Sequence, residues 1–142
     1  MKNYWWIVAV VVVVAGYLIF NGQSSGDGII DDDVSEYAEL ITLDTIVANQ
    51  TVASPLVITG QAVGPWYFEA SFPIELKDGN GLTIASDIAT AQSDWMVTGF
   101  VPFTATLTFP TPVTTSGTLI LHKDNPSGEP INDDQLIVPV SF

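Results

Sequence analysis

The chain has 142 residues, of which 47% are hydrophobic, and this length suits one domain with an appendage. Three Lys and no Arg stand against 16 acidic residues, for a net charge of −13. A chain this acidic repels phosphate backbones and anionic lipid headgroups, which excludes nucleic acid as a partner. The absence of Cys excludes disulfides, thiolate catalysis and Cys-based zinc sites. The single His, His122, excludes a His-rich metal cluster within one chain.

Residues 5–20, "WWIVAVVVVVAGYLIF", contain no charged residue and predict a transmembrane helix. As a helix the stretch would extend roughly 24 Å, near the short end of what a bilayer core requires. Aromatic residues stand at both of its ends, as is typical of membrane–water interfaces. We interpret the stretch as an uncleaved signal anchor. The alternatives are a cleaved signal peptide, for which the following "NGQSSGDG" offers no clear A-x-A cleavage pattern, and a buried core helix.

The charges around this stretch predict its orientation. Lys2 is the basic residue beside the predicted helix, so residues 1–4 should stay in the cytoplasm. All 16 acidic residues follow the helix. We therefore expect a single-pass protein of the cell membrane, with everything from about Asn21 onward outside the cytoplasm.

Residues 21–39 are predicted to be a flexible acidic linker. Their stretch "NGQSSGDGIIDDDVSE" is rich in Gly, Ser and Asp and cannot bury much surface. The triplet Asp31, Asp32 and Asp33 could chelate a divalent cation, but a solvated spacer has no fixed ligand geometry.

Residues 40–142 predict one all-β domain. Short runs of β-branched and aromatic residues alternate with turn signals, and there is no amphipathic helical pattern. The strongest period-2 signal places Phe103, Ala105, Leu107 and Phe109 on one face. About seven strands of this kind predict an immunoglobulin-like antiparallel β-sandwich. The seven candidate strands are 40–47, 56–62, 66–76, 82–86, 95–109, 118–123 and 135–142.

The order of several motifs carries a family resemblance. They are "VASPLVITGQA", "PWYFEASFPIEL", "DGNG", "DWM", "FVPFTATLTF" and "LHKDNPSGEP". Together they resemble the bacterial spore-germination immunoglobulin-like domain, which is often found beside GerMN domains, over nearly all of residues 40–142. The resemblance implies a sandwich outside the cytoplasmic membrane that mediates interactions. It brings no catalytic residue to this chain.

The polar stretch between the last two candidate strands allows two interpretations. Asp124, Asn125, Asp133 and Asp134 offer hard oxygen ligands, so they are candidates for a calcium site. The spacing does not fit an EF-hand loop, because positions 3 and 5 counted from Asp124 would be Pro and Gly. The other interpretation is a long turn, since Asn-Pro and Ser-Gly favour turns.

Two residues are candidate partner contacts. In one long strand over 66–76, Tyr67 and Glu69 would have the opposite parity to Trp66 and Phe72 and would therefore face solvent. Catalysis is not expected. His122 belongs to no recognisable triad, and Glu69 with Glu75 as paired carboxylates would need a cleft that a small sandwich rarely has.

The sequence therefore predicts a non-enzymatic, membrane-anchored interaction module of the cell envelope, related to sporulation, germination or a more general envelope process. Its partners would be the membrane, through the helix, and another envelope protein or a cell-wall polymer. The alternative is a carbohydrate- or cell-wall-binding module assisted by calcium. No cofactor is expected.

Overall fold

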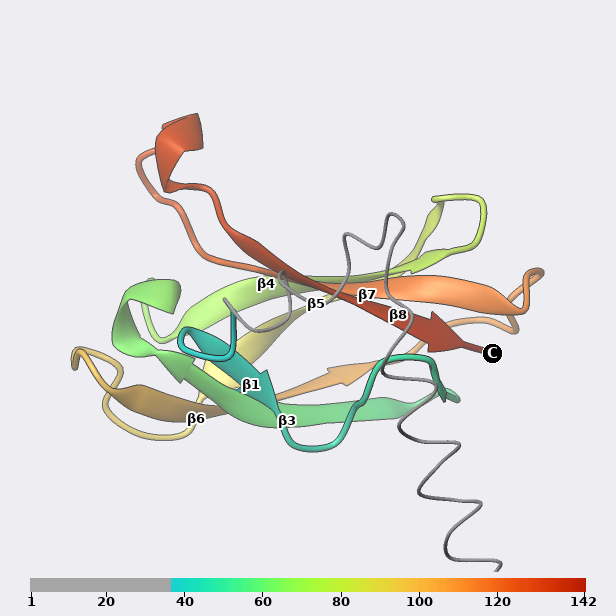
Figure 1. Cartoon of the computed structure of the whole chain (residues 1–142), viewed down its shortest axis with the longest axis horizontal. Coiled ribbons are helices and arrows are strands. Elements are labelled where there is room, and N and C mark those ends of the chain that lie inside the picture. Colours follow the sequence, from blue (N-terminus) through green and yellow to red (C-terminus); the bar gives the residue numbers. More distant parts are fainter. Residues whose placement is uncertain (1–36) are drawn as a thin grey trace, which may run out of the picture. The chain divides into compact units, whose positions relative to one another are not determined.

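The computed structural model describes residues 37–142, which form an all-β immunoglobulin-like sandwich (Figure 1). The predicted span 5–20 and most of the predicted linker lie outside the described residues. Within residues 37–142, no helix has the length and apolar character needed to cross a membrane. Eight strands are formed, with bounds Ile41–Leu43 (β1), Gln50–Thr51 (β2), Leu56–Val63 (β3), Ser71–Asp78 (β4), Thr83–Ala91 (β5), Phe100–Leu107 (β6), Ser116–His122 (β7) and Gln135–Ser141 (β8).

The strands follow the order β1-β3-β6-β5-β4-β7-β8-β2 and fold into two layers (Figure 1). One layer contains β1, β3 and β6, which are antiparallel neighbours. The other contains β5, β4, β7 and β8, also antiparallel. Strand β5 links the layers, because its last residues pair with β6 at Thr90↔Thr104 and Ala91↔Phe103.

The core lies between the layers and follows from the period-2 patterns. In β6 every second residue from Val101 to Leu107 is buried, as the sequence predicts. Phe72 of β4 contacts Phe103 of β6 edge-on, with 4.9 Å between ring centroids, and so connects the two layers. Trp66 also packs edge-on against Phe72. Each fully buried side chain of this size contributes roughly 2–3 kcal/mol by leaving water.

The seven predicted strands all occur, but the run 66–76 is not one strand. A 3-10 turn, Gly64–Trp66 (η1), precedes it, and Phe68 and Ser71 exchange backbone hydrogen bonds around a tight turn. Glu69 and Ala70 occupy this turn with φ of 50° and 65°. Positive φ usually signals Gly or Asn, so Glu-Ala gives no local sign of a turn here.

The hairpin between β4 and β5 falls on the stretch "DGNG", whose Gly residues are typical of tight turns. The backbone turns at Gly81, where φ is +80°. The Asp78 carboxylate is buried and accepts hydrogen bonds from the backbone N–H groups of Asn80 and Leu82. An Asp at the start of a turn commonly satisfies the following backbone in this way.

The eighth strand, β2, is short and has no local sequence signal. It pairs in parallel with the end of β8, at Gln50↔Val140 and Thr51↔Ser141. Between β1 and β2 the chain leaves one layer and joins the other. As a result β2 covers only the last two residues of β8, which leaves the earlier part of that edge without a strand partner among the described residues.

Gly64 is expected to be essential for packing the turn between β3 and β4. A Cβ at this position would collide with the carbonyl oxygens of Trp95 and Val97, which are backbone atoms that cannot rotate away. Gly64→Ala should therefore lower the free energy of unfolding by about 1–3 kcal/mol. Urea denaturation followed by tryptophan fluorescence measures this change. Gly99→Ala is the matched control, because a Cβ at Gly99 meets nothing within 4 Å; equal losses in the two variants would contradict the prediction.

Candidate functional site

Tyr67 is not an exposed contact residue, and that prediction is wrong. Its side chain is 4% exposed and packs edge-on against Phe72 at 5.2 Å. Its hydroxyl donates a 2.7 Å hydrogen bond to the carbonyl oxygen of Val101. The parity argument failed because η1 and the following turn replace the expected strand, so Trp66 and Tyr67 are both buried. Tyr67 is therefore not available as a ring on which a carbohydrate could stack.

Glu69, the other predicted contact, is exposed, but for a different reason than strand alternation. It lies in the tight turn between Phe68 and Ser71, with its backbone in the left-handed region. No hydrogen bond or ion pair of its side chain is formed with another described residue. Glu69 lies outside strand β4, which carries Glu75, so the two carboxylates do not belong to one strand as the sequence suggested.

Glu75 instead belongs to a small polar network on the outer face of the β4–β7 layer. Its Oε1 lies 3.0 Å from Nε2 of His122, and its Oε2 accepts a hydrogen bond from Thr83. Lys77 lies 3.6 Å from the same carboxylate. Burial opposes ionisation of Glu75, but the hydrogen bonds from His122 and Thr83 and the charge of Lys77 outweigh it and lower the pKa of Glu75.

This network stabilises the sheet in a pH-dependent manner. A carboxyl group whose pKa is lower in the folded state favours folding once the pH exceeds its unfolded pKa. The contribution of Glu75 is therefore present near neutral pH and is lost as the pH falls through the folded pKa. His122 and Glu75 are hydrogen-bonded to each other on an open sheet face, an arrangement typical of a structural contact.

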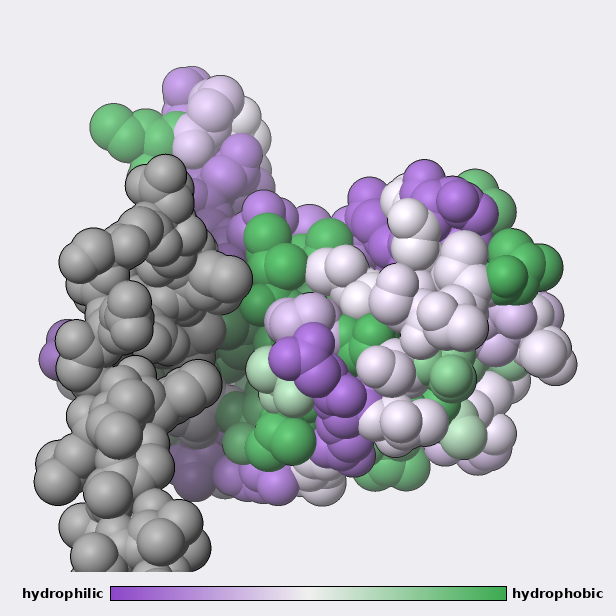
Figure 2. Space-filling view, turned by 45° about the vertical axis from the view of Figure 1, so that its right-hand side comes forward, coloured by the Kyte–Doolittle hydropathy of each residue, from purple (hydrophilic) through white to green (hydrophobic). Residues whose placement is uncertain are grey.

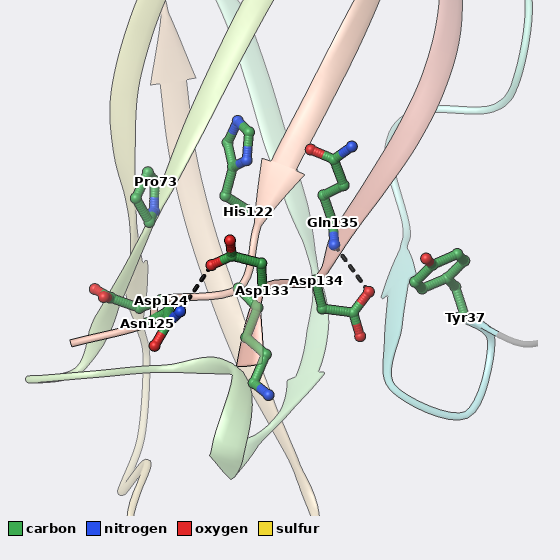
Figure 3. Close-up of a pocket in the computed structure, with 9 residues that line it drawn as sticks. Tyr37, Pro73, His122, Asp124, Asn125, Asp133, Asp134 and Gln135 are labelled. Carbon is green, nitrogen blue, oxygen red and sulfur yellow. Dashed lines mark hydrogen bonds between the residues drawn. The ribbon is translucent and has the colours of Figure 1, made fainter. Parts of the chain in front are cut away.

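The four calcium candidates come together in the loop between β7 and β8, around a surface hollow of about 680 Å³ (Figure 3). We call this the acidic hollow; it is lined by Tyr37, Pro73, His122, Lys123, Asp124, Asn125, Asp133, Asp134 and Gln135. In Figure 3 the carboxyl groups of Asp124 and Asp134 lie on opposite sides of Asp133. The acidic side chains thus share the hollow without converging on one point.

Local hydrogen bonds engage three of the four candidate ligands, Asn125, Asp133 and Asp134. Asn125 Nδ2 donates to Asp133 Oδ1 at 2.7 Å and to the Glu129 carbonyl oxygen at 2.8 Å. Asp134 Oδ1 accepts from the backbone N–H of Gln135. A second 3-10 turn, Pro130–Asn132 (η2), lies within the loop. Within residues 37–142, no group of three or more His, Asp and Glu side chains is arranged to hold a metal ion. These contacts favour the turn interpretation of the stretch.

Next to the acidic hollow lies an apolar groove that the sequence did not predict. It has a volume of about 330 Å³ and runs between the edge of β1 and the edge of β8. Residues 37–38, 41–43 and 46–48 line one side, and residues 136–139 line the other. Figure 2 shows hydrophobic residues reaching the surface of the domain beside hydrophilic ones. The groove is the surface of the described domain best suited to hold an apolar ligand.

The β8 edge of this groove carries backbone groups without a strand partner. The carbonyl oxygens of Pro139 and Ser141 accept hydrogen bonds from Asn49 and Val52, on the side away from β7. Because these directions alternate along a strand, the N–H and C=O of Ile137 also point away from β7. No described residue bonds to them. Pro139 was the available sequence signal, since Pro inside a strand is typical of a sheet edge.

The fold and this edge together define an immunoglobulin-like domain with an open strand edge. A family model for the immunoglobulin-like domain of bacterial spore germination matches residues 43–129, and the chain belongs to that family. The match covers the strands from β2 to β7 and most of the loop that lines the acidic hollow. Neither the curated proteins nor the solved structures yield a match to this chain.

Tyr67 predicts a loss of stability in alkali. Burial raises the pKa of Tyr67 from 10.0 to about 12, so the protonated phenol is favoured in the fold. The contribution of the protonated phenol to the free energy of unfolding is complete below pH 10. It falls by roughly 2–3 kcal/mol as the pH rises toward 12. Tyr67→Phe should cost about 1–2 kcal/mol at pH 7, through the lost hydrogen bond, and should remove this part of the alkaline loss.

The measurement is the free energy of unfolding in urea at several pH values from 7 to 12, for the wild type and for Tyr67→Phe. The difference between the two should shrink or change sign as the pH rises. Parallel curves across the whole range would contradict the assignment of the buried phenol.

Proposed function

We propose that this protein is a membrane-anchored interaction module that acts outside the cytoplasm and binds another protein of the cell envelope. The observation that carries the proposal is the open edge of β8 beside the apolar groove. A strand edge with unpaired N–H and C=O groups can accept an extended segment of another chain. The neighbouring groove can bury apolar side chains of that segment, which adds a favourable term to the hydrogen bonds.

The role of the module is binding and not catalysis. Glu75 and His122, the titratable side chains that would suggest general acid–base chemistry, are engaged with each other on an open sheet face. A general acid or base needs a substrate held within hydrogen-bond reach in a site that excludes water. The apolar groove, by contrast, is lined by no Asp, Glu, Lys or His of residues 37–142.

The anchor is residues 5–20, and the domain follows it on the far side of the membrane. Three sequence features support this arrangement: the uncharged apolar stretch, Lys2 before it, and the acidic residues that all follow it. The family is linked to bacterial spore germination. A domain held at the membrane surface would meet its partner in two dimensions, which raises their effective concentration.

The predicted topology can be tested with single-cysteine variants, because the natural chain contains no Cys. Thr111→Cys places a thiol on an exposed loop of the domain, and Asn3→Cys places one before the predicted helix. In intact cells a membrane-impermeant maleimide should label Thr111→Cys fully and Asn3→Cys only after lysis. Labelling of Asn3→Cys in intact cells, or protection of Thr111→Cys, would rule out the proposed orientation.

Binding at the groove can be tested by photo-crosslinking in living cells. A photoreactive amino acid replaces Ile137 at the groove or Val57 on β3, and the two side chains are matched in exposure at 51% and 52%. We expect a discrete protein adduct from position 137 and none from position 57. Identical adduct patterns at both positions, or none at either, would argue against a binding surface at this edge.

A further inference from the structure

The apolar groove and the acidic hollow are consecutive along β8. Gln135 lines the hollow and residues 136–139 line the groove, while Tyr37 borders both. A segment lying beside β8 would therefore pass from an apolar environment into an acidic one within a few residues. This arrangement determines which side chains the bound segment needs at each end.

We propose that the groove receives an extended segment of a partner protein, with alternating apolar side chains and a Lys or Arg at the end that meets Asp133 and Asp134. The proposal rests on the proposed function and specifies the chemistry of the partner. The acidic residues would not constitute a site by themselves. They select among segments that the strand edge and the groove already accept.

The extended conformation follows from the backbone of β8. The outward N–H and C=O of Ile137 and the outward C=O of Gln135 lack partners among the described residues, whereas the Pro139 carbonyl already accepts from Asn49. Strand β2 occupies the edge at Val140 and Ser141. The open stretch is thus short, and it suits a segment of about five residues.

The alternation follows from the two faces of that edge. Leu136 and Val138 point into the core and are buried, so side chains of the added strand on the same face would enter the groove against Ile41 and Ile46. Side chains on the other face would lie beside Ile137, which is exposed. Only every second side chain of the segment therefore has to be apolar.

The basic residue at the end of the segment follows from the charges that border the acidic hollow and the apolar groove. The hollow is lined by three acidic residues, Asp124, Asp133 and Asp134, and also by Lys123 and His122. On the β1 side of the groove, Glu39 and Asp44 are exposed. With a net charge of −13, a second copy of this chain would be repelled, whereas a basic segment would be attracted.

The test uses fluorescent peptides and the full-length chain in nonionic detergent micelles, with binding followed by anisotropy. The first peptide alternates Val and Thr over seven residues and has two Lys at each end. The second has Glu in place of every Lys. The third keeps the Lys ends but carries N-methyl groups on alternate backbone nitrogens, on the edge that would pair with β8.

We expect the Lys-ended peptide to bind at least about tenfold more tightly than the Glu-ended peptide at low ionic strength, with a smaller ratio at high salt. N-methylation should abolish binding. On the protein side, Ile137→Pro should abolish binding, because it removes the N–H that points away from β7.

Charge variants test the acidic residues directly. Asp134→Asn should reduce the preference for Lys ends, and Asp133→Asn together with Asp134→Asn should reduce it further. Asp87→Asn is the matched control and should change nothing. Its carboxylate accepts the backbone N–H of the next residue, as that of Asp134 does, but it lies on β5 away from the groove.

The outcomes separate this inference from the proposed function. Equal affinity for Lys-ended and Glu-ended peptides would overturn the basic partner while leaving strand addition in place. If no peptide binds but position 137 still crosslinks to another protein through a surface that is not an extended segment, the proposed chemistry of the segment is overturned and the proposed function is retained. A position-137 adduct to a second copy of this chain would replace the partner by self-association. Failure of every peptide with no adduct at position 137 would overturn both proposals.

Discussion

The edge-on contact between Phe72 and Phe103 is the interaction on which the rest of the domain depends. The chain has no Cys, so the two layers are joined by apolar contacts and by the short link between β5 and β6. The rings of Trp66 and Tyr67 also pack edge-on against Phe72, and these contacts hold the turn that leads into β4. Edge-on aromatic pairs add about 0.5–1.5 kcal/mol each beyond the area they bury.

The position of the groove follows from how the chain enters this sandwich. Strand β1 belongs to one layer and β2 to the other, and the connection between them runs along the open side of the core. If β1 and β2 formed one continuous strand beside β8, that edge would be closed along its whole length. The crossing thus creates both the exposed edge and the apolar walls. Apart from Pro139, which is typical of a sheet edge, no residue type marks either feature, so the groove could not be predicted from the sequence.

The sequence was informative where local pattern decides structure. Strict alternation in β6 predicted its buried face, and the Asp-Gly-Asn-Gly stretch is of the composition typical of the hairpin found after β4. It was uninformative where distant contacts decide. Strand β2 exists because Val52 and Asn49 find carbonyl oxygens on β8, and Tyr67 is buried because Gly64 fits against the backbone near Val97. The sequence placed the aspartates of the β7–β8 loop in one polar stretch, but neither the hollow nor their hydrogen bonds to their own loop could be read from residue types.

Pro139 has a consequence for how far an added strand can extend. Its nitrogen carries no hydrogen, and its carbonyl oxygen already accepts from Asn49, so hydrogen-bonded pairing along β8 ends there. A strand added at this edge can form a few backbone hydrogen bonds but cannot pair with β8 along its whole length. Open edges of this kind are ordinarily the places where proteins stack into fibrils. By limiting the number of backbone hydrogen bonds that an added strand can make, Pro139 restricts the growth of such stacks.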